Sequence, residues 1–172
     1  MFTISSHIGL VYAGIGPDVN SIIKKLRKDC LTYDQVYRDR IPVFMLAKEA
    51  ASLMQEYTVK GGFRPFGCSL LIAGVDHEGP KVFRVDPSGV FNAWKAAAIG
   101  KNMESASDFL EKRYEDDLEL EDAVHVALLT MKEGYEGEMS ESNIEIGIVN
   151  ESDKTFKVLS EGEVKDYLKE AS

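Results

Sequence analysis

The residues best placed to do chemistry lie near the start of the chain, where a loop with two glycines follows a short apolar run. Residues 7–13 (HIGLVYA) lead into Gly14 and Gly16, and a segment with helical spacing begins near Asp18. Strand, glycine loop and helix is the arrangement in which backbone N–H groups bind phosphate in dinucleotide-binding proteins. The loop is therefore a candidate nucleotide site.

The residues after this loop argue against a nucleotide. A dinucleotide fingerprint would need a third glycine where Val19 stands, and a P-loop would need glycine and lysine at Asn20 and Ser21. The carboxylate of Asp18 would also compete with phosphate for the positive end of the helix. We therefore expect the glycines to turn the chain and Asp18 to cap the helix. A small-molecule-binding domain that uses the Gly14–Asp18 loop stays as an alternative.

Other catalytic and metal-binding patterns are weak. His7, His77 and His125 have no ligand partners at the short spacing that zinc sites use, and no G-x-S-x-G elbow occurs. An N-terminal threonine can attack a peptide bond with its own amine as base. Phe2 precedes Thr3, however, and no processing site is recognisable, so we do not expect Thr3 to react. We predict no catalytic residue, no cofactor and no metal.

A run of carboxylates occupies residues 111–122 (EKRYEDDLELED). It lacks the regularly spaced oxygen ligands and the glycine of a calcium-binding loop. Acidic residues at the start of a helix also interact favourably with its dipole. We therefore interpret the run as a solvated link between two helices.

The composition excludes several classes of partner. The 172 residues are 44% hydrophobic and 28% charged, and the formal net charge is -9, which argues against binding nucleic acid or an anionic membrane surface. Cys30 and Cys68 form no C-x-x-C pair, which favours free thiols in a reducing, intracellular setting. No basic region of a signal peptide and no membrane-spanning run is visible. The length suits one domain, residues 1–172.

The hydrophobic period changes several times and defines the elements that position these residues. Helices arrive in consecutive pairs and strands in hairpins, so we predict an α+β fold with antiparallel sheets covered by helices. Ser105 or Ser107 is the expected cap of the third helix, and Ser160 with Glu163 forms a capping box for the last one. The expected elements are a strand at 7–13, helices at 18–37 and 42–60, strands at 66–75, 81–85 and 90–99, helices at 107–114 and 120–131, strands at 144–149 and 155–159, and a final helix after residue 160.

Several strings in the chain resemble the signature of alpha-type subunits of the proteasome. The first three are Arg64-Pro65-Phe66-Gly67, the turn Asp86-Pro87-Ser88-Gly89, and residues 94–100 (WKAAAIG), which include Lys95 and Gly100. Residues 109–114 (FLEKRY) and 117–123 (DLELEDA) follow in the order of that family. Residues 54–58 (MQEYT), 143–148 (NIEIGI) and 163–168 (EVKDYL) are most similar to the second alpha type. The resemblance runs from about residue 7 to the C-terminus.

This resemblance implies a four-layer αββα sandwich of the N-terminal-nucleophile hydrolase type. It also implies a non-catalytic structural subunit of the alpha ring, whose partners are other alpha subunits in a heptameric ring, the beta ring, and a regulatory particle or activators. The expected role is ring assembly in ubiquitin-dependent protein degradation in the cytoplasm and nucleus. Family members carry a helix and a strand pair before the segment that begins here, so we expect the fold to lack both.

The alternative within the same fold is a beta-type subunit, a threonine peptidase. Such a subunit would present a mature N-terminal threonine followed by a strand, with an aspartate and a lysine in the first strand pair. The sequence shows none of these features. The alpha type is therefore the leading hypothesis.

Overall fold

The computed structural model describes residues 1–170, and its largest sheet is antiparallel throughout. The sheet has the spatial order β1-β2-β3-β4-β5. Its strands are β1 (Phe2–Ser5), β2 (Ile8–Gly14), β3 (Cys68–Asp76), β4 (Gly79–Val85) and β5 (Phe91–Trp94). Leu10 of β2 lies opposite Ile72 of β3, and Ile72 lies opposite Phe83 of β4. Residues opposite one another project from the same face, so these three side chains form one apolar layer.

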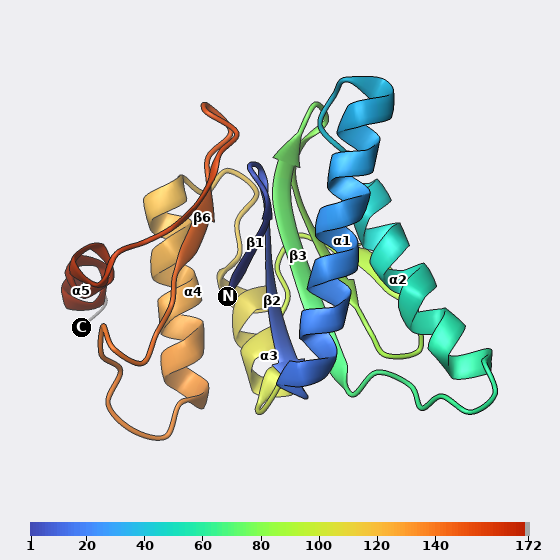
Figure 1. Cartoon of the computed structure of the whole chain (residues 1–172). Coiled ribbons are helices and arrows are strands. Elements are labelled where there is room, and N and C mark those ends of the chain that lie inside the picture. The colour runs from blue at the N-terminus through green and yellow to red at the C-terminus, as the bar shows by residue number, and fades with distance from the viewer. Residues whose placement is uncertain (171–172) are drawn as a thin grey trace.

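Two helices cover this apolar face (Figure 1). α1 (Gly16–Tyr37) and α2 (Val43–Val59) each bury a stripe of side chains with a spacing of three or four residues. Ile22 and Leu26 of α1 and Leu46 and Met54 of α2 have no exposed surface. The main core therefore lies between these helices and the five-stranded sheet.

The remaining elements lie on the other side of the sheet (Figure 1). They are α3 (Met103–Arg113), α4 (Leu120–Gly134), β6 (Gly147–Val149), β7 (Phe156–Val158) and α5 (Glu161–Glu170). β6 and β7 form a two-stranded antiparallel sheet. A second, smaller core joins this hairpin to the helices, and its buried members are Val124, Leu128, Ile144, Leu159 and Val164.

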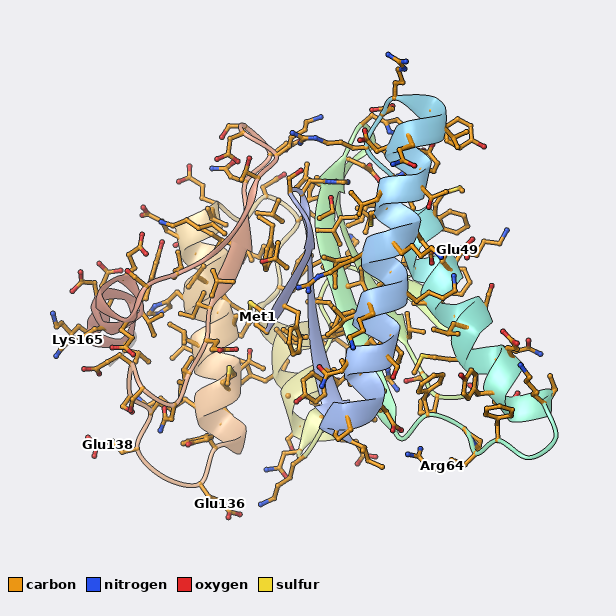
Figure 2. The ribbon with its side chains drawn as sticks, viewed as in Figure 1. Met1, Glu49, Arg64, Glu136, Glu138 and Lys165 are labelled. Carbon is orange, nitrogen blue, oxygen red and sulfur yellow. The ribbon has the colours of Figure 1, made fainter. Side chains whose placement is uncertain are left out.

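The two sheets meet where β7 crosses the start of β2. The backbone N–H of Phe156 donates a hydrogen bond of 2.8 Å to the carbonyl oxygen of Ser6. The ring of Phe156 fills the space that a side chain at Gly9 would need. The amino group of Met1, central in Figure 2, forms an ion pair with Glu145 just before β6. The residues on either side of β1 therefore tie the large sheet to the β6–β7 hairpin.

The observed order confirms the predicted pairs of helices and the predicted hairpins, with local corrections. The strand β1 was not expected, and the third strand of the meander ends at Trp94 instead of continuing to residue 99. α3 begins at Met103, after Asn102 in the left-handed conformation, and the Ser107 hydroxyl donates to the carbonyl of Met103 instead of capping the helix. None of the helices within residues 1–170 is long and apolar enough to cross a membrane.

Candidate functional site

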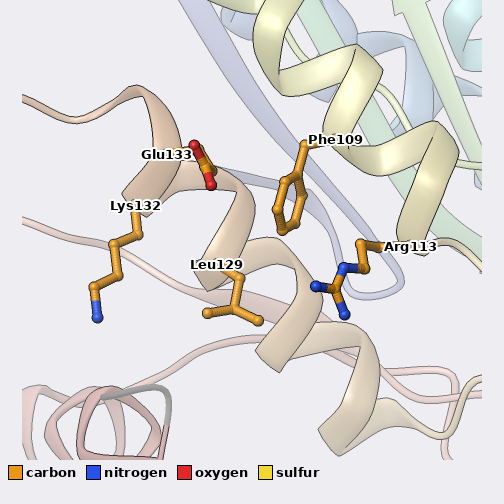
Figure 3. A pocket seen from close by; sticks show the side chains of 5 residues that line it. All are labelled: Phe109, Arg113, Leu129, Lys132 and Glu133. Atoms are coloured by element: carbon orange, nitrogen blue, oxygen red, sulfur yellow. The ribbon is translucent and has the colours of Figure 1, made fainter.

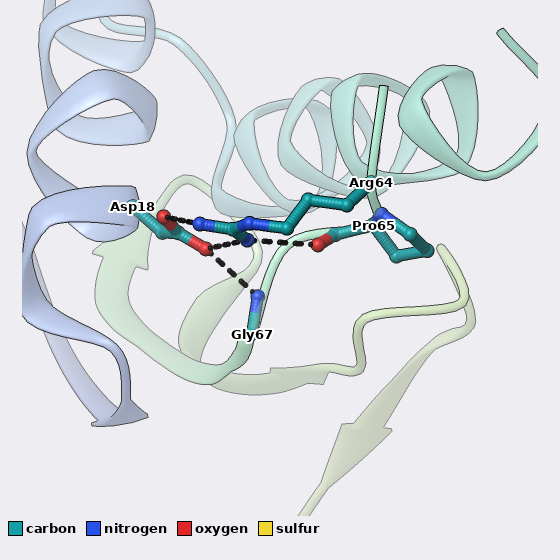
Figure 4. A network of polar contacts seen from close by, with 4 residues as sticks. All are labelled: Asp18, Arg64, Pro65 and Gly67. Carbon is teal, nitrogen blue, oxygen red and sulfur yellow. Dashed lines mark hydrogen bonds and ion pairs between the residues drawn. The ribbon is translucent and has the colours of Figure 1, made fainter. Parts of the chain in front are cut away.

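The signature residue Arg64 closes an ion pair across the start of the sheet (Figure 4). Its Nη1 and Nη2 atoms donate to the two carboxylate oxygens of Asp18 at 2.6 and 2.7 Å. The backbone N–H of Gly67 donates to the same carboxylate at 2.9 Å, and Nη1 also donates to the carbonyl oxygen of Pro65. A bidentate guanidinium–carboxylate pair has defined geometry as well as charge attraction. Arg64, Pro65 and Gly67 therefore fix the entry into β3 against the first turn of α1.

This network corrects the expectation for Asp18. α1 has no side-chain cap, and Ile15 occupies its N-cap position. The hydrogen bonds from Arg64 and from the Gly67 N–H hold the pKa of Asp18 at about 2, below its usual 3.8. The Asp18 carboxylate therefore joins α1 to the entry of β3 and does not cap the helix. Phe66, between Pro65 and Gly67, is buried, and its ring centroid lies 4.5 Å from that of Tyr57.

Replacing Asp18 with asparagine should remove a contribution to the free energy of unfolding that depends on pH. Because the pKa of Asp18 is lower in the folded chain than in the unfolded chain, its contribution is present above about pH 4 and is lost as the pH falls towards about 2. Urea unfolding should show a D18N deficit at about pH 6 that shrinks at about pH 3. Asp108→Asn, an exposed change of equal charge, is the control. A deficit that does not vary with pH would contradict this account.

The second signature string forms the tight turn between β4 and β5. The N–H of Gly89 donates to the carbonyl of Asp86 at 2.9 Å, and the N–H of Asp86 donates to the carbonyl of Val90. The Asp86 carboxylate accepts from Arg84 Nε at 3.1 Å. Ser88 accepts from the Val90 N–H, and Pro87 is half-buried between Asp86 and Ser88. The string is thus a structural turn, and it packs against α2 through Gly89.

The third string connects β5 to α3 on the far side of the sheet. Lys95 forms an ion pair of 2.5 Å with Asp116 and lies 5.9 Å from the ring centroid of Tyr114. Gly100 approaches Ala13 near the end of β2. These contacts bring the acidic link between α3 and α4 to the sheet. In all three strings the signature residues make turns and connections, and Lys95 contacts the acidic run at Tyr114 and Asp116.

The residues with nucleophilic side chains have structural contacts. Thr3 lies within β1 opposite Gly9, and its carbonyl oxygen accepts two hydrogen bonds from Arg27. Cys30 and Cys68 are free and buried. Burial raises the pKa of each thiol to about 11, so both are protonated at neutral pH and are poor nucleophiles.

His7 is the buried histidine of the three, whereas His77 is exposed and His125 is half-buried. Its Nε2 lies 2.8 Å from the carbonyl oxygen of Ile41, and its Nδ1 lies 2.8 Å from the hydroxyl of Ser5. A carbonyl oxygen can only accept, so Nε2 carries the proton and Nδ1 accepts from the hydroxyl. The neutral ring therefore ties the β1–β2 turn to the link between α1 and α2.

Protonation of His7 should destabilise the fold. Burial lowers its pKa below 6.5, Arg40 acts in the same direction, and the Ile41 carbonyl, Asp76 and Asp39 oppose the shift. The folded chain then resists a proton that the unfolded chain accepts, so stability falls as the pH drops below about 6.5. His7→Gln should weaken this dependence between about pH 7 and 5.5 in urea unfolding, and exposed His77→Gln should leave it unchanged. Identical slopes for H7Q and the parent chain would refute the prediction.

A surface pocket of about 420 Å³ lies between α3 and α4 (Figure 3). Phe109 of α3 and Leu129 of α4 line it, together with Arg113, Lys132 and Glu133. The Arg113 guanidinium lies 5.7 Å from the Phe109 ring centroid. Within residues 1–170 no group of three His, Cys, Asp or Glu side chains could hold a metal ion. The pocket carries no arrangement of nucleophile, base and orienting group of the kind that catalysis needs.

Comparison with known proteins identifies the family to which the chain belongs. Residues 1–149 match the family model of the proteasome subunit. The chain belongs to the proteasome subunit family. It is 54% identical to proteasome subunit alpha type-2 of Oryza sativa subsp. indica over 168 residues, which are 98% of this chain and 71% of that protein. The alpha type-2 subunits of Dictyostelium discoideum and Drosophila melanogaster are 54% and 53% identical over 96% of the chain.

These relatives confirm the resemblance to alpha-type proteasome subunits, and to the second alpha type, that the sequence strings indicated. The sequence did not predict the pairing of Asp18 with Arg64, whose positions are 46 residues apart. The sequence contains no local sign of this pair, because neither residue indicates the position of its partner. In this proteasome subunit the ion pair of Asp18 with Arg64 joins the first turn of α1 to the segment before β3.

Proposed function

We propose that the chain is a non-catalytic structural subunit of the alpha ring of the proteasome core particle. The observation that supports this most directly is the identity of 52–54% to alpha type-2 subunits over 96–98% of the chain. The signature strings add that Arg64, Asp86 and Lys95 serve turns and connections. Such residues determine the shape of a subunit more than they determine a reaction.

The proposed fold is the four-layer sandwich of that family. α1 and α2 would form one outer layer, and α3, α4 and α5 the other. The five-stranded sheet and the β6–β7 hairpin would form the two inner layers (Figure 1). The contact of Phe156 with Gly9 supports face-to-face stacking of the two sheets.

The proposed partners are the other alpha subunits of a heptameric ring, the beta ring, and a regulatory particle or activators, in the cytoplasm and nucleus. Exposed apolar side chains on both sides of the α1–α2 link support assembly. They are Val36 and Tyr37 at the end of α1 and Phe44 and Met45 at the start of α2, with 38–66% of each exposed. Neighbouring apolar side chains left in water often mark a protein interface.

Co-purification from native cells tests this proposal. The tagged chain should co-purify in a large complex with other alpha and beta subunits, which mass spectrometry would identify. Val36→Glu should reduce that recovery severalfold without lowering the melting temperature, because a charge in a desolvated interface is unfavourable. Lys24→Glu, an exposed change on the same helix, is the matched control. Recovery of the chain alone or with chaperones would overturn the proposal.

The same preparation tests the absence of catalysis in this chain. Complexes that contain Thr3→Ala should cleave fluorogenic peptides at the rate of the parent complex. The hydroxyl of Thr3 lies on an exposed residue within β1, so its loss should also leave folding unchanged. Loss of one class of peptide cleavage in T3A would instead support the threonine peptidase alternative.

A further inference from the structure

A second cavity, of about 440 Å³, lies between β1 and α1. We call it the β1–α1 groove. One wall carries Ser5 and Ser6, and the opposite wall is one stripe of α1 that contains Arg27, Leu31 and Asp34. Residues separated by four and seven positions lie on one helical face, which explains why these α1 side chains line the same space. The proposed ring function assigns no role to this cavity.

The floor of the β1–α1 groove is apolar. Ile4, Cys30 and Ile41 are buried there, with 4–9% of each residue exposed. The protonated thiol of Cys30 contributes as a small apolar group. Leu31 extends the apolar surface to the rim, where 65% of the residue is exposed. A ligand that fills this space must therefore present an apolar body.

Two guanidinium groups border the same floor, and both are held in place. Arg27 donates to the carbonyl of Thr3 from Nε at 3.1 Å and from Nη2 at 2.8 Å. Arg40 donates from Nη1 to the carbonyl of Lys154 at 3.1 Å. Because a guanidinium has five N–H donors, each keeps several for a ligand. Their fixed positions reduce the conformational entropy that binding would cost.

The charge of the groove differs in sign from that of the chain. The lining contains two arginines, Arg27 and Arg40, and one carboxylate, Asp34, so its net charge is +1, whereas that of the chain is -9. Neither arginine, nor Asp34, belongs to an ion pair within the described residues. The positive charge is therefore available to an anionic group.

We propose that the β1–α1 groove binds a small molecule that has an apolar body and a carboxylate group. Ligand sites are typically concave and mostly apolar, with a few fixed polar groups that orient the ligand, and the cavity lies within the usual size range. The planar guanidinium matches a carboxylate with two parallel hydrogen bonds. Ser6 lies on the wall opposite the helix and its hydroxyl can donate a further hydrogen bond, whereas the Ser5 hydroxyl already donates to His7.

Three probes with the same six-carbon chain test the proposed chemistry on the full chain. Hexanoate, 1-hexanol and hexylamine would each be titrated into methyl-labelled protein and followed by NMR. Hexanoate should shift the methyl signals of Ile4, Leu31 and Ile41 with a millimolar dissociation constant, since so small a ligand binds weakly. Hexanol should bind about tenfold more weakly and hexylamine more weakly still, because both lack the carboxylate. Equal binding of hexanol and hexanoate, or shifts outside the groove, would overturn the proposal.

Two variants test the charges in opposite directions. Asp34→Asn should tighten hexanoate binding severalfold by removing the one carboxylate of the lining, and Arg40→Glu should weaken it at least about tenfold. Glu104→Gln and Lys24→Glu, exposed changes of matching charge elsewhere, should leave the affinity unchanged. If R40E fails to fold, the gain in D34N decides the matter, because a damaged structure would not bind more tightly. Unchanged affinity in D34N would refute a carboxylate in the groove.

Discussion

Gly9→Val should lower the free energy of unfolding by about 3 kcal/mol, near the upper end of the usual cost of overpacking. An added Cβ at this position would overlap the ring of Phe156, which belongs to the strand that crosses β2. Phe156 is also bound through its backbone to Ser6, so it cannot easily move away. In a chain of this length the loss corresponds to roughly 10 °C in melting temperature.

Matched variants separate overlap from a general effect of valine. Gly61→Val is the control, since nothing lies within 4 Å of a Cβ at Gly61. Phe156→Ala removes the ring, so the double variant with G9V should be more stable than the sum of the two single losses predicts. Strict additivity in urea unfolding would show that Gly9 and Phe156 do not form the junction between the sheets.

The predicted elements were most accurate where the periodic hydrophobic pattern extended over many residues. The stripe Ile22, Leu26 and Cys30 predicted α1, and all three side chains are buried. The strand expected at 66–75 is present as β3, which covers Cys68–Asp76 and in which buried and half-buried residues alternate from Cys68 to Gly74. Such periods reflect burial against one neighbouring layer, which a sequence records directly.

Local chemistry predicted termini less well, because distant residues compete for the same groups. Asp18 was expected to cap α1 and instead binds Arg64 and the Gly67 N–H. Glu163 does reach back to the Ser160 N–H at 2.8 Å, which is one half of the expected capping box, but the Ser160 hydroxyl donates to the same carboxylate. Where the partner lies 46 residues away, the sequence contains no local sign of it.

Short elements and weakly packed helices were also difficult to predict. β1 has four residues, and its alternation of Ile4 with exposed Thr3 is too brief to establish a period. In α4 the helical spacing places Leu128 and Met131 on one apolar face, but Leu128 is buried and Met131 is 47% exposed. The second core is small, so it covers only part of the helix face.

For the candidate site, too, the sequence indicated the residues but not their contacts. The strings around Arg64, Asp86 and Lys95 led to the family, yet their roles emerged only from contacts in three dimensions. The β1–α1 groove could not be predicted at all, since it joins residues 4–6 to residues 27–41. Its signal is the arrangement of Arg27 and Arg40 around an apolar floor.

Gly89→Ala should be the most damaging single change within the signature strings, at about 3 kcal/mol, because two costs coincide. Gly89 has φ 86°, a conformation that costs a residue with a Cβ about 1–2 kcal/mol. The added methyl would also overlap the Cβ of Gln55 and lie 2.9 Å from the carbonyl oxygen of Ala51. Neither atom belongs to the flexible end of a side chain, so α2 would have to shift away from the turn.

Two other glycines divide this cost into its parts. Gly62 has φ 82° with nothing within 4 Å of a Cβ, so Gly62→Ala should cost about 1 kcal/mol from the backbone alone. Gly61 has neither constraint, and Gly61→Ala should change stability by less than about 0.5 kcal/mol. Urea unfolding of the three variants should therefore give a graded series. If G89A is no worse than G62A, the turn does not press on α2. The Asp86–Gly89 string would then be required only for its backbone conformation.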